Sequence, residues 1–237
     1  MKSPADPVSI KTGEATPYAL ADPGTLLPVG RYRLEFVAEE TVHLPGYPGS
    51  AWRDALGHAL RATVCVTRER ECGACLLYRS CVYPYVFETP PPVGAVKMRR
   101  YRAAPHPFVL QIENVGSAAD DFAEPEAVDA TLSPRAVAEG ERVVLGLVLF
   151  GRANRELPYF VHALGRAAAE GIGGGRGRLA LVSVWQQDLA TDTWTRIHAS
   201  GGPLAARAVS SPGPAPAPRE PVRVLIATPL RLRRDDR

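Results

Sequence analysis

Residues 142–187 read RVVLGLVLFGRANRELPYFVHALGRAAAEGIGGGRGRLALVSVWQQ, and they determine the predicted topology. This stretch begins and ends with apolar runs of strand length, at 142–151 and 179–187, that are rich in valine and leucine. Between these runs, residues 157–171 have the apolar spacing of a helix, and Pro158 stands in the first turn, where its missing N–H costs nothing. The stretch therefore predicts a strand, a helix and a second strand.

A strand followed by a helix is also predicted nearer the N-terminus. RYRLEFVAE, residues 31–39, alternates polar and apolar side chains as a half-buried strand does. SAWRDALGHALRA, residues 50–62, is typical of a helix in which Ser50 is the N-cap. The apolar stripe of that helix consists of Trp52, Ala55, Leu56, Ala59 and Leu60. Further strands are predicted at VYPYVFE, PFVLQIE, TWTRIHA and VRVLIATPLRL, residues 82–88, 107–113, 193–199 and 222–232.

The order of these elements predicts an α+β protein with a ferredoxin-like, or RRM-like, split βαβ unit. A doubly wound fold would need more helices between the strands. The domain boundaries follow from composition. We expect an N-terminal arm, a main domain that includes a four-cysteine insertion at 65–81, a Pro/Ala-rich linker, and a last strand with a basic tail, at residues 1–29, 30–200, 201–221 and 222–237 respectively.

Composition limits the class of protein. The chain has 237 residues, of which 46% are hydrophobic and 22% charged, as in ordinary globular domains. No apolar run approaches the ~18 residues of a membrane span. The first residues lack the apolar core of a secretory signal, so we expect a cytoplasmic protein.

The net charge of +3 is too small to identify a polyanionic partner, but the charges are segregated along the chain. This pattern favours one face for a polyanion, although charge runs on solvated loops would look the same. The basic groups are Lys97, Arg99, Arg100 and Arg102, and then Arg231, Arg233, Arg234 and Arg237; the acidic group is Asp120, Asp121, Glu124, Glu126 and Asp129.

Four cysteines follow the pattern C-x6-C-x2-C-x5-C, at Cys65, Cys72, Cys75 and Cys81. In a cytoplasmic protein, cysteines this close in sequence indicate a metal site rather than disulfides. Four thiolates complete the tetrahedral coordination of Zn²⁺ and leave no open position, which predicts a structural zinc site. An iron–sulfur cluster and buried free thiols are the alternatives.

The glycine-rich segment after the second helix is the most informative local feature. Glycines let the backbone approach a ligand closely, and arginines can bind phosphates in a fork. The segment is neither a Walker A loop nor a dinucleotide fingerprint. The alternative is a helix-capping glycine followed by a flexible turn. The segment comprises Gly171, Gly173, Gly174, Gly175, Arg176, Gly177 and Arg178.

None of the five histidines pairs with another at helical spacing, so a catalytic metal held by histidines is not predicted. His162 lies in an apolar helical stretch and is interpreted as a packed core residue, whereas His106 and His198 are interpreted as incidental. His58 and His43 could transfer protons, because imidazole titrates near neutral pH. For each of these two, a surface histidine without a role is the alternative.

Five blocks, taken together in this order, resemble the CRISPR-associated endoribonucleases of the RAMP superfamily that cut precursor CRISPR RNA within its repeats. The resemblance extends over roughly residues 30–232. The blocks are LPGYPGSAWRDALGHALR, CGACLLYRSCVYPYVFE, LVLFGRANRELPYFVHAL, GIGGGRGR and ATPLRL.

The resemblance implies metal-independent cleavage in which a ribose 2′-hydroxyl attacks the adjacent phosphate. The products would carry a 2′,3′-cyclic phosphate and a 5′-hydroxyl. His58 is the best match to the family's catalytic histidine and His43 is second, with Tyr47, Arg53 and Arg61 as helpers. Residues 171–178 match the family's RNA-contacting loop. No cofactor for catalysis is implied.

Relatives of this kind usually carry two RAMP domains, and residues 222–237 look like the start of the second. Either this chain is a truncated or minimal member, or another subunit supplies the missing half. Besides CRISPR repeat RNA, other CRISPR effector subunits are possible partners. Two other functions stay open: a RAMP subunit that holds CRISPR RNA without cutting it, and a zinc-stabilised protein-interaction domain unrelated to RNA.

Overall fold

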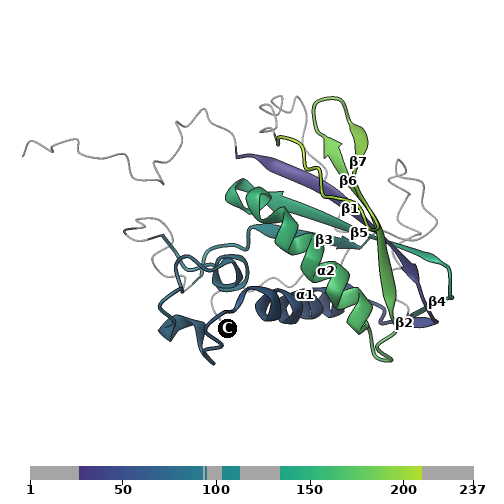
Figure 1. Cartoon of the computed structure of the whole chain (residues 1–237), viewed down its shortest axis with the longest axis horizontal. Helices are drawn as coiled ribbons and strands as arrows, with labels where there is room; N and C mark the ends of the chain where they lie inside the picture. The colour runs from purple at the N-terminus through teal and green to yellow at the C-terminus, as the bar shows by residue number, and fades with distance from the viewer. Residues whose placement is uncertain (1–26, 93, 95–102, 113–133, 210–237) are drawn as a thin grey trace, which may run out of the picture.

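The computed structural model describes residues 27–92, 94, 103–112 and 134–209 (Figure 1). Several predicted features therefore lie outside the described residues. They are most of the N-terminal arm, the basic segment at 97–102, the acidic stretch at 120–129, and the last strand with its basic tail at 222–237.

The core of the fold is a five-stranded sheet in the order β3-β5-β1-β6-β7. Strand β1 lies at the centre and pairs antiparallel with both β5 and β6. Its alternating sequence puts Tyr32, Leu34 and Phe36 in the core and leaves the residues between them on the other face. The strands are β1 (Val29–Ala38), β3 (Phe108–Ile112), β5 (Arg142–Phe150), β6 (Leu179–Asp188) and β7 (Thr193–Ala199).

Two helices, α1 (Gly49–Val64) and α2 (Leu157–Glu170), lie side by side on one face of this sheet (Figure 1). The predicted apolar stripe of α1 faces the core, where the rings of Trp52 and Phe36 lie 5.0 Å apart. Pro158 occupies the first turn of α2, as expected. The helices therefore bury one sheet face, and no helix of the described residues lies on the other.

The element order β1-α1-β3-β5-α2-β6, with the sheet order given above, is a ferredoxin-like fold with β7 added at the edge. The predicted α+β class is thus confirmed. No helix among the described residues is long and apolar enough to cross a membrane.

The predicted strand at residues 82–88 is wrong. Residues Pro84–Glu88 form a short π-helix, η2, in which the rings of Tyr83 and Phe87 stack 5.4 Å apart. The strand was predicted because aromatic side chains stand at alternate positions of this segment. Pro84, however, has no N–H to donate to a sheet.

The expected N-cap of α1 is also wrong, because the helix begins one residue earlier, at Gly49, after Pro48. The Ser50 hydroxyl instead donates a hydrogen bond to the carbonyl of Tyr47, 3.3 Å away. The sequence analysis missed a two-stranded sheet of β2 (Val42–Leu44) and β4 (Arg135–Val137). Strands of three residues are too short to show an alternating pattern.

Candidate functional site

The glycine-rich loop joins α2 to β6 and closes on itself. Gly171 ends the helix at a φ of 106°, in a region that favours glycine. Beyond it, the Ile172 N–H donates a hydrogen bond to the Gly177 carbonyl at 2.9 Å, forming an isolated β-bridge. Buried Ile172 anchors the turn. The loop is therefore held at its base, while its tip is exposed.

The same loop packs on β2, an arrangement that the sequence did not reveal. A Cβ at Gly173 would lie 2.3 Å from the His43 carbonyl oxygen, and one at Gly177 would lie 2.8 Å from the Cα of Val42. By contrast, a Cβ at Gly174 or Gly175 would meet nothing within 4 Å. The structure thus brings the loop and His43 together and leaves the backbone at the loop tip open.

The two loop arginines are tethered to acidic or carbonyl groups. The backbone N–H and the Nε of Arg178 both donate to Glu40 Oε1, at 3.1 and 3.2 Å, and these bonds lower the pKa of Glu40. Arg176 reaches the Glu170 carbonyl at 3.4 Å. Because exposed ion pairs contribute little energy, a phosphate can compete for either guanidinium.

His58 belongs to a different group of residues, toward the other end of α1. Its exposed ring is fixed by Nδ1, which donates to the Asp54 carbonyl at 2.8 Å and leaves Nε2 available. The ring lines an open depression of about 470 Å³ together with Arg61 and Arg68. In Figure 1, the glycine-rich loop and the four-cysteine insertion lie at opposite ends of α1. His43 and His58 are therefore in separate groups.

The predicted RNA-binding arginines of α1 make contacts within the protein. The guanidinium of Arg53 lies 5.5 Å from the Phe87 ring centroid and 5.4 Å from that of Phe108. Arg61 donates to the carbonyls of Glu69 and Arg70 at 2.7 and 2.8 Å. Both arginines thus hold neighbouring segments against α1.

Tyr47 precedes α1 in the turn after β2, and its side chain is 55% exposed. Its ring lies close to Gly49, where a Cβ would be 3.3 Å away. The phenol is therefore accessible near the start of α1.

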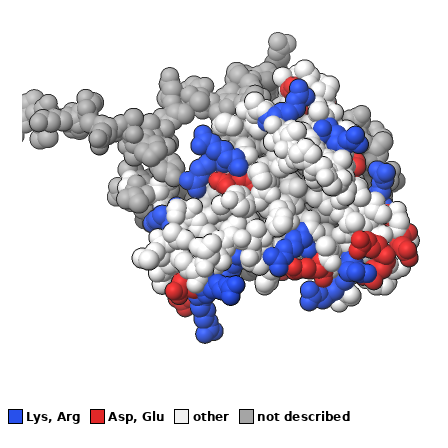
Figure 2. Space-filling view, in the orientation of Figure 1, with Lys and Arg blue, Asp and Glu red and all other residues white. Residues whose placement is uncertain are grey.

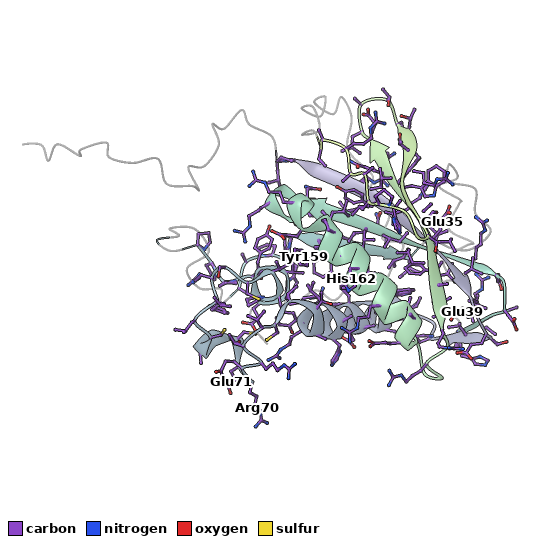
Figure 3. All side chains as sticks on the ribbon, in the orientation of Figure 1. Glu35, Glu39, Arg70, Glu71, Tyr159 and His162 are labelled. Atoms are coloured by element: carbon purple, nitrogen blue, oxygen red, sulfur yellow. The ribbon has the colours of Figure 1, made fainter. Side chains whose placement is uncertain are left out.

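The expectation that His162 is a core residue is wrong, because its side chain is exposed on the outer face of α2 beside Tyr159 (Figure 3). The helix buries Phe160, Val161 and Leu164 instead, which turns position 162 outward. His106 is half-buried, and its Nδ1 donates a hydrogen bond to the Val86 carbonyl oxygen at 3.1 Å. Burial, with Arg53 nearby, lowers the pKa of His106.

The four cysteines lie around one small cavity of about 20 Å³ where α1 meets the insertion. All are free thiols, and burial, together with Glu88, raises the pKa of Cys72 to about 11. Within the described ranges, no group of three or more His, Cys, Asp or Glu side chains is arranged to hold a metal ion.

The sheet face opposite the helices carries residues that the sequence analysis missed. Cross-strand pairing places Trp185 between Arg33 and Arg196. The Arg33 guanidinium stacks 4.1 Å from the centroid of Trp194, and the Trp185 Nε1 donates to Ser183 Oγ at 2.9 Å. The signal was present in the sequence as arginines and tryptophans at alternate strand positions.

The opposite, helix-bearing side has a different character. Figure 2 shows basic side chains there in several separate groups, most of them beside acidic ones. The described residues on this face therefore form no single broad basic surface.

Comparison with known proteins gives three results. The AF_1859_N family model, described as an N-terminal domain, matches residues 27–209. No curated protein matches the chain. Among solved structures, a chain in the crystal structure of the Csm3-Csm4 subcomplex of the type III-A CRISPR-Cas interference complex is 11% identical, with a TM-score of 0.41. That similarity covers 73% of this chain and 90% of the other.

Proposed function

This chain belongs to the AF_1859_N family, whose N-terminal domain spans residues 27–209, and we propose that it binds CRISPR repeat RNA and cleaves precursor CRISPR RNA in the cytoplasm. The proposal rests on the resemblance of its sequence blocks to the repeat-processing endoribonucleases. The reaction would be attack of a ribose 2′-hydroxyl on the adjacent phosphate, without a metal. It would leave a 2′,3′-cyclic phosphate and a 5′-hydroxyl.

The observation that carries the proposal is the packing of the glycine-rich loop on β2 at His43. Consecutive backbone N–H groups in such a loop can bind an anion, and Gly174 and Gly175 have no neighbouring atoms that would block it. Arg176 and Arg178 stand beside these glycines. A phosphate bound at the loop tip would therefore lie close to a cationic pair and to β2.

Two histidines, one in each group of residues, are the candidates for proton transfer in this reaction. His58 is our first candidate for the base, for a scissile phosphate bound in the depression that it lines with Arg61 and Arg68, because its Nδ1 bond leaves Nε2 as an acceptor on an exposed ring. His43 is the second, because its strand touches the phosphate-binding loop. General acid–base catalysis of this kind contributes about 10²–10⁴-fold in rate. Tyr47, which lies between them in sequence, is an accessible phenol and would assist as a hydrogen-bond donor.

The open sheet face would hold unpaired nucleotides of the same RNA. Single-stranded RNA is commonly bound by stacking bases on aromatic side chains or on guanidinium planes. Trp185, Trp194, Arg33 and Arg196 supply both kinds of group on neighbouring strands. The proposal thus has a cleavage site at the edge of the fold and a base-stacking surface on the sheet.

A specific observation supports a second candidate function, a non-catalytic RAMP subunit that holds CRISPR RNA within an effector complex. His43 and His58 lie in separate groups, and Arg61, which lines the His58 depression, donates its hydrogen bonds to carbonyls of the insertion. In this case a further chain would supply what the reaction lacks. RNA binding is common to both functions, whereas cleavage separates them.

The test compares the parent chain with His58→Ala, His43→Ala and the control His162→Ala, using end-labelled repeat RNA in EDTA. His162 is a suitable control because it is an exposed histidine on α2. We expect loss of cleavage in one of the first two variants, unchanged RNA affinity in both, and full activity in the control. Tight binding without cleavage by the parent would support the subunit role instead. RNA affinity that is weak and independent of salt would contradict both, because phosphate contacts release counterions.

A further inference from the structure

We propose that Cys65, Cys72, Cys75 and Cys81 bind one structural Zn²⁺ ion that fastens the insertion to the end of α1. All four residues line the same small cavity, along with apolar side chains from α1 and the insertion. Four thiolates supply the donor atoms that Zn²⁺ prefers and close its coordination shell. The site is thus structural, and it lies away from the glycine-rich loop (Figure 1).

The backbone already presents the cysteines in fixed turns. Cys65 caps α1, and its N–H donates to the Arg61 carbonyl at 2.9 Å. The Cys75 N–H donates to the Cys72 carbonyl at 2.9 Å, and the Cys81 N–H donates to the Leu77 carbonyl at 2.8 Å. Each cysteine is therefore held by a local hydrogen bond on the rim of the cavity.

One sulfur also accepts hydrogen bonds of the kind that support metal-bound thiolates. The Leu77 N–H donates to Cys75 Sγ at 3.4 Å, and the Thr67 hydroxyl lies 3.3 Å from the same sulfur. Such outer contacts orient a thiolate ligand and compensate part of its charge. The Leu77 N–H is thus a backbone donor that would stabilise a thiolate at Cys75.

The insertion has too little apolar packing to account for its order. Leu76 is 100% exposed, Val66 77% and Leu77 40%. Figure 3 shows Arg70 and Glu71 projecting outward from the same segment. A segment that buries so few apolar side chains needs a cross-link, and metal binding supplies folding free energy directly.

In this structure the four thiols do not surround a single ion position, since the described part of the chain has no group of three or more side chains arranged to hold a metal ion. All four cysteines are partly accessible, so a metal ion can reach the cavity that they line. Arg61 donates hydrogen bonds to the carbonyls of Glu69 and Arg70 and so holds the insertion beside the cavity. Zn²⁺ binding would therefore draw the four thiols of this cavity closer together than they lie in this structure.

The test is metal analysis of the full chain purified under reducing conditions. We expect one zinc per chain, released only when thiols are modified, and a Co²⁺-substituted form with sulfur-to-cobalt charge-transfer absorption. Cys75→Ser should lose the metal, whereas Ser80→Ala, in the same insertion, should keep it. If Cys75→Ser fails to fold, the Co²⁺ spectrum of the parent chain still decides the matter.

Two outcomes would overturn the assignment. Iron with acid-labile sulfide and visible absorption would mean an iron–sulfur cluster in place of Zn²⁺. A metal-free chain with four freely reactive thiols and a Tm unaffected by chelators would mean no metal centre. Neither experiment involves RNA, so failure here leaves the proposed RNA cleavage untouched.

Discussion

The backbone carbonyl oxygen of His43 lies so close to Gly173 that a Cβ added there would be 2.3 Å from it. The contact joins two segments 130 positions apart in sequence, β2 and the loop after α2. Because Gly173 also has a φ of 81°, a side chain at this position is disfavoured by space and by backbone conformation. The loop can rest on β2 only with glycine at position 173.

Gly173→Ala should therefore lift the loop from β2 and weaken RNA binding about tenfold, since the positive φ alone costs ~1–2 kcal/mol. Filter binding of repeat RNA at constant salt measures the effect. Gly174→Ala is the matched control, because its Cβ would meet nothing within 4 Å. Equal losses in the two variants would contradict the idea that the contact with His43 positions the loop.

Trp194→Ala should lower the affinity for single-stranded repeat RNA, because base stacking on an aromatic ring contributes ~1–3 kcal/mol per base. The loss should persist at high salt, since stacking releases few counterions. Tyr159→Ala, which removes an aromatic ring 42% exposed on α2, should leave the affinity unchanged. If the Trp194→Ala chain binds RNA as tightly as its parent, the sheet face does not contact the RNA.

Arg61→Ala should loosen the insertion, since it removes two charge-assisted hydrogen bonds to the carbonyls of Glu69 and Arg70. Each such bond contributes ~1.5–3 kcal/mol at most, so the expected loss of unfolding free energy is about 1–3 kcal/mol. Limited proteolysis followed by mass spectrometry should find new cuts within residues 65–81. Arg166→Ala removes only an exposed pair with Glu170 and should behave like the parent. Unchanged proteolysis in Arg61→Ala would contradict this structural role of the arginine.

The stability of the fold should fall as the pH drops below 6.5, the ordinary pKa of histidine, because the pKa of His106 is lowered in the folded chain. In that range His106 is protonated in the unfolded chain but stays largely neutral in the folded chain, so protonation favours unfolding. Well above pH 6.5 the His106 ring is neutral in both states, so its titration does not lower the free energy of unfolding there. Thermal unfolding at pH 8 and pH 5 should show a smaller drop in Tm for His106→Asn than for the parent. If His106→Asn and His162→Asn give the same pH dependence as the parent, another group causes it.

The sequence was enough for most of the fold, because strand β1 and helix α2 carry strong periodic signals. Tyr32, Leu34 and Phe36 alternate with polar residues, and the structure buries them as expected. The π-helix at Pro84–Glu88 was missed because alternate aromatic residues occur in strands and in such turns alike. Local pattern could not distinguish the two, whereas packing against α1 and β3 does.

The candidate site was predictable in its parts but not in its arrangement. The glycines and arginines of residues 171–178 were recognised, yet their contact with β2 depends on a three-residue strand that leaves no pattern. His162 was misplaced because its neighbours along the chain are apolar, although the helical period turns it outward. Long-range placement of this kind comes from the packing of the whole domain.

Cleavage of repeat RNA by its own 2′-hydroxyl can be tested by comparing two substrates. The chain is incubated in EDTA with repeat RNA and with the same RNA carrying a single 2′-deoxynucleotide at the cut position, and the product ends are read by mass spectrometry. We predict a single cut with a 2′,3′-cyclic phosphate in the first RNA, and tight binding without cleavage in the second. Cleavage of the deoxy-substituted RNA, a 3′-hydroxyl product, or intact RNA in both samples would contradict the claim.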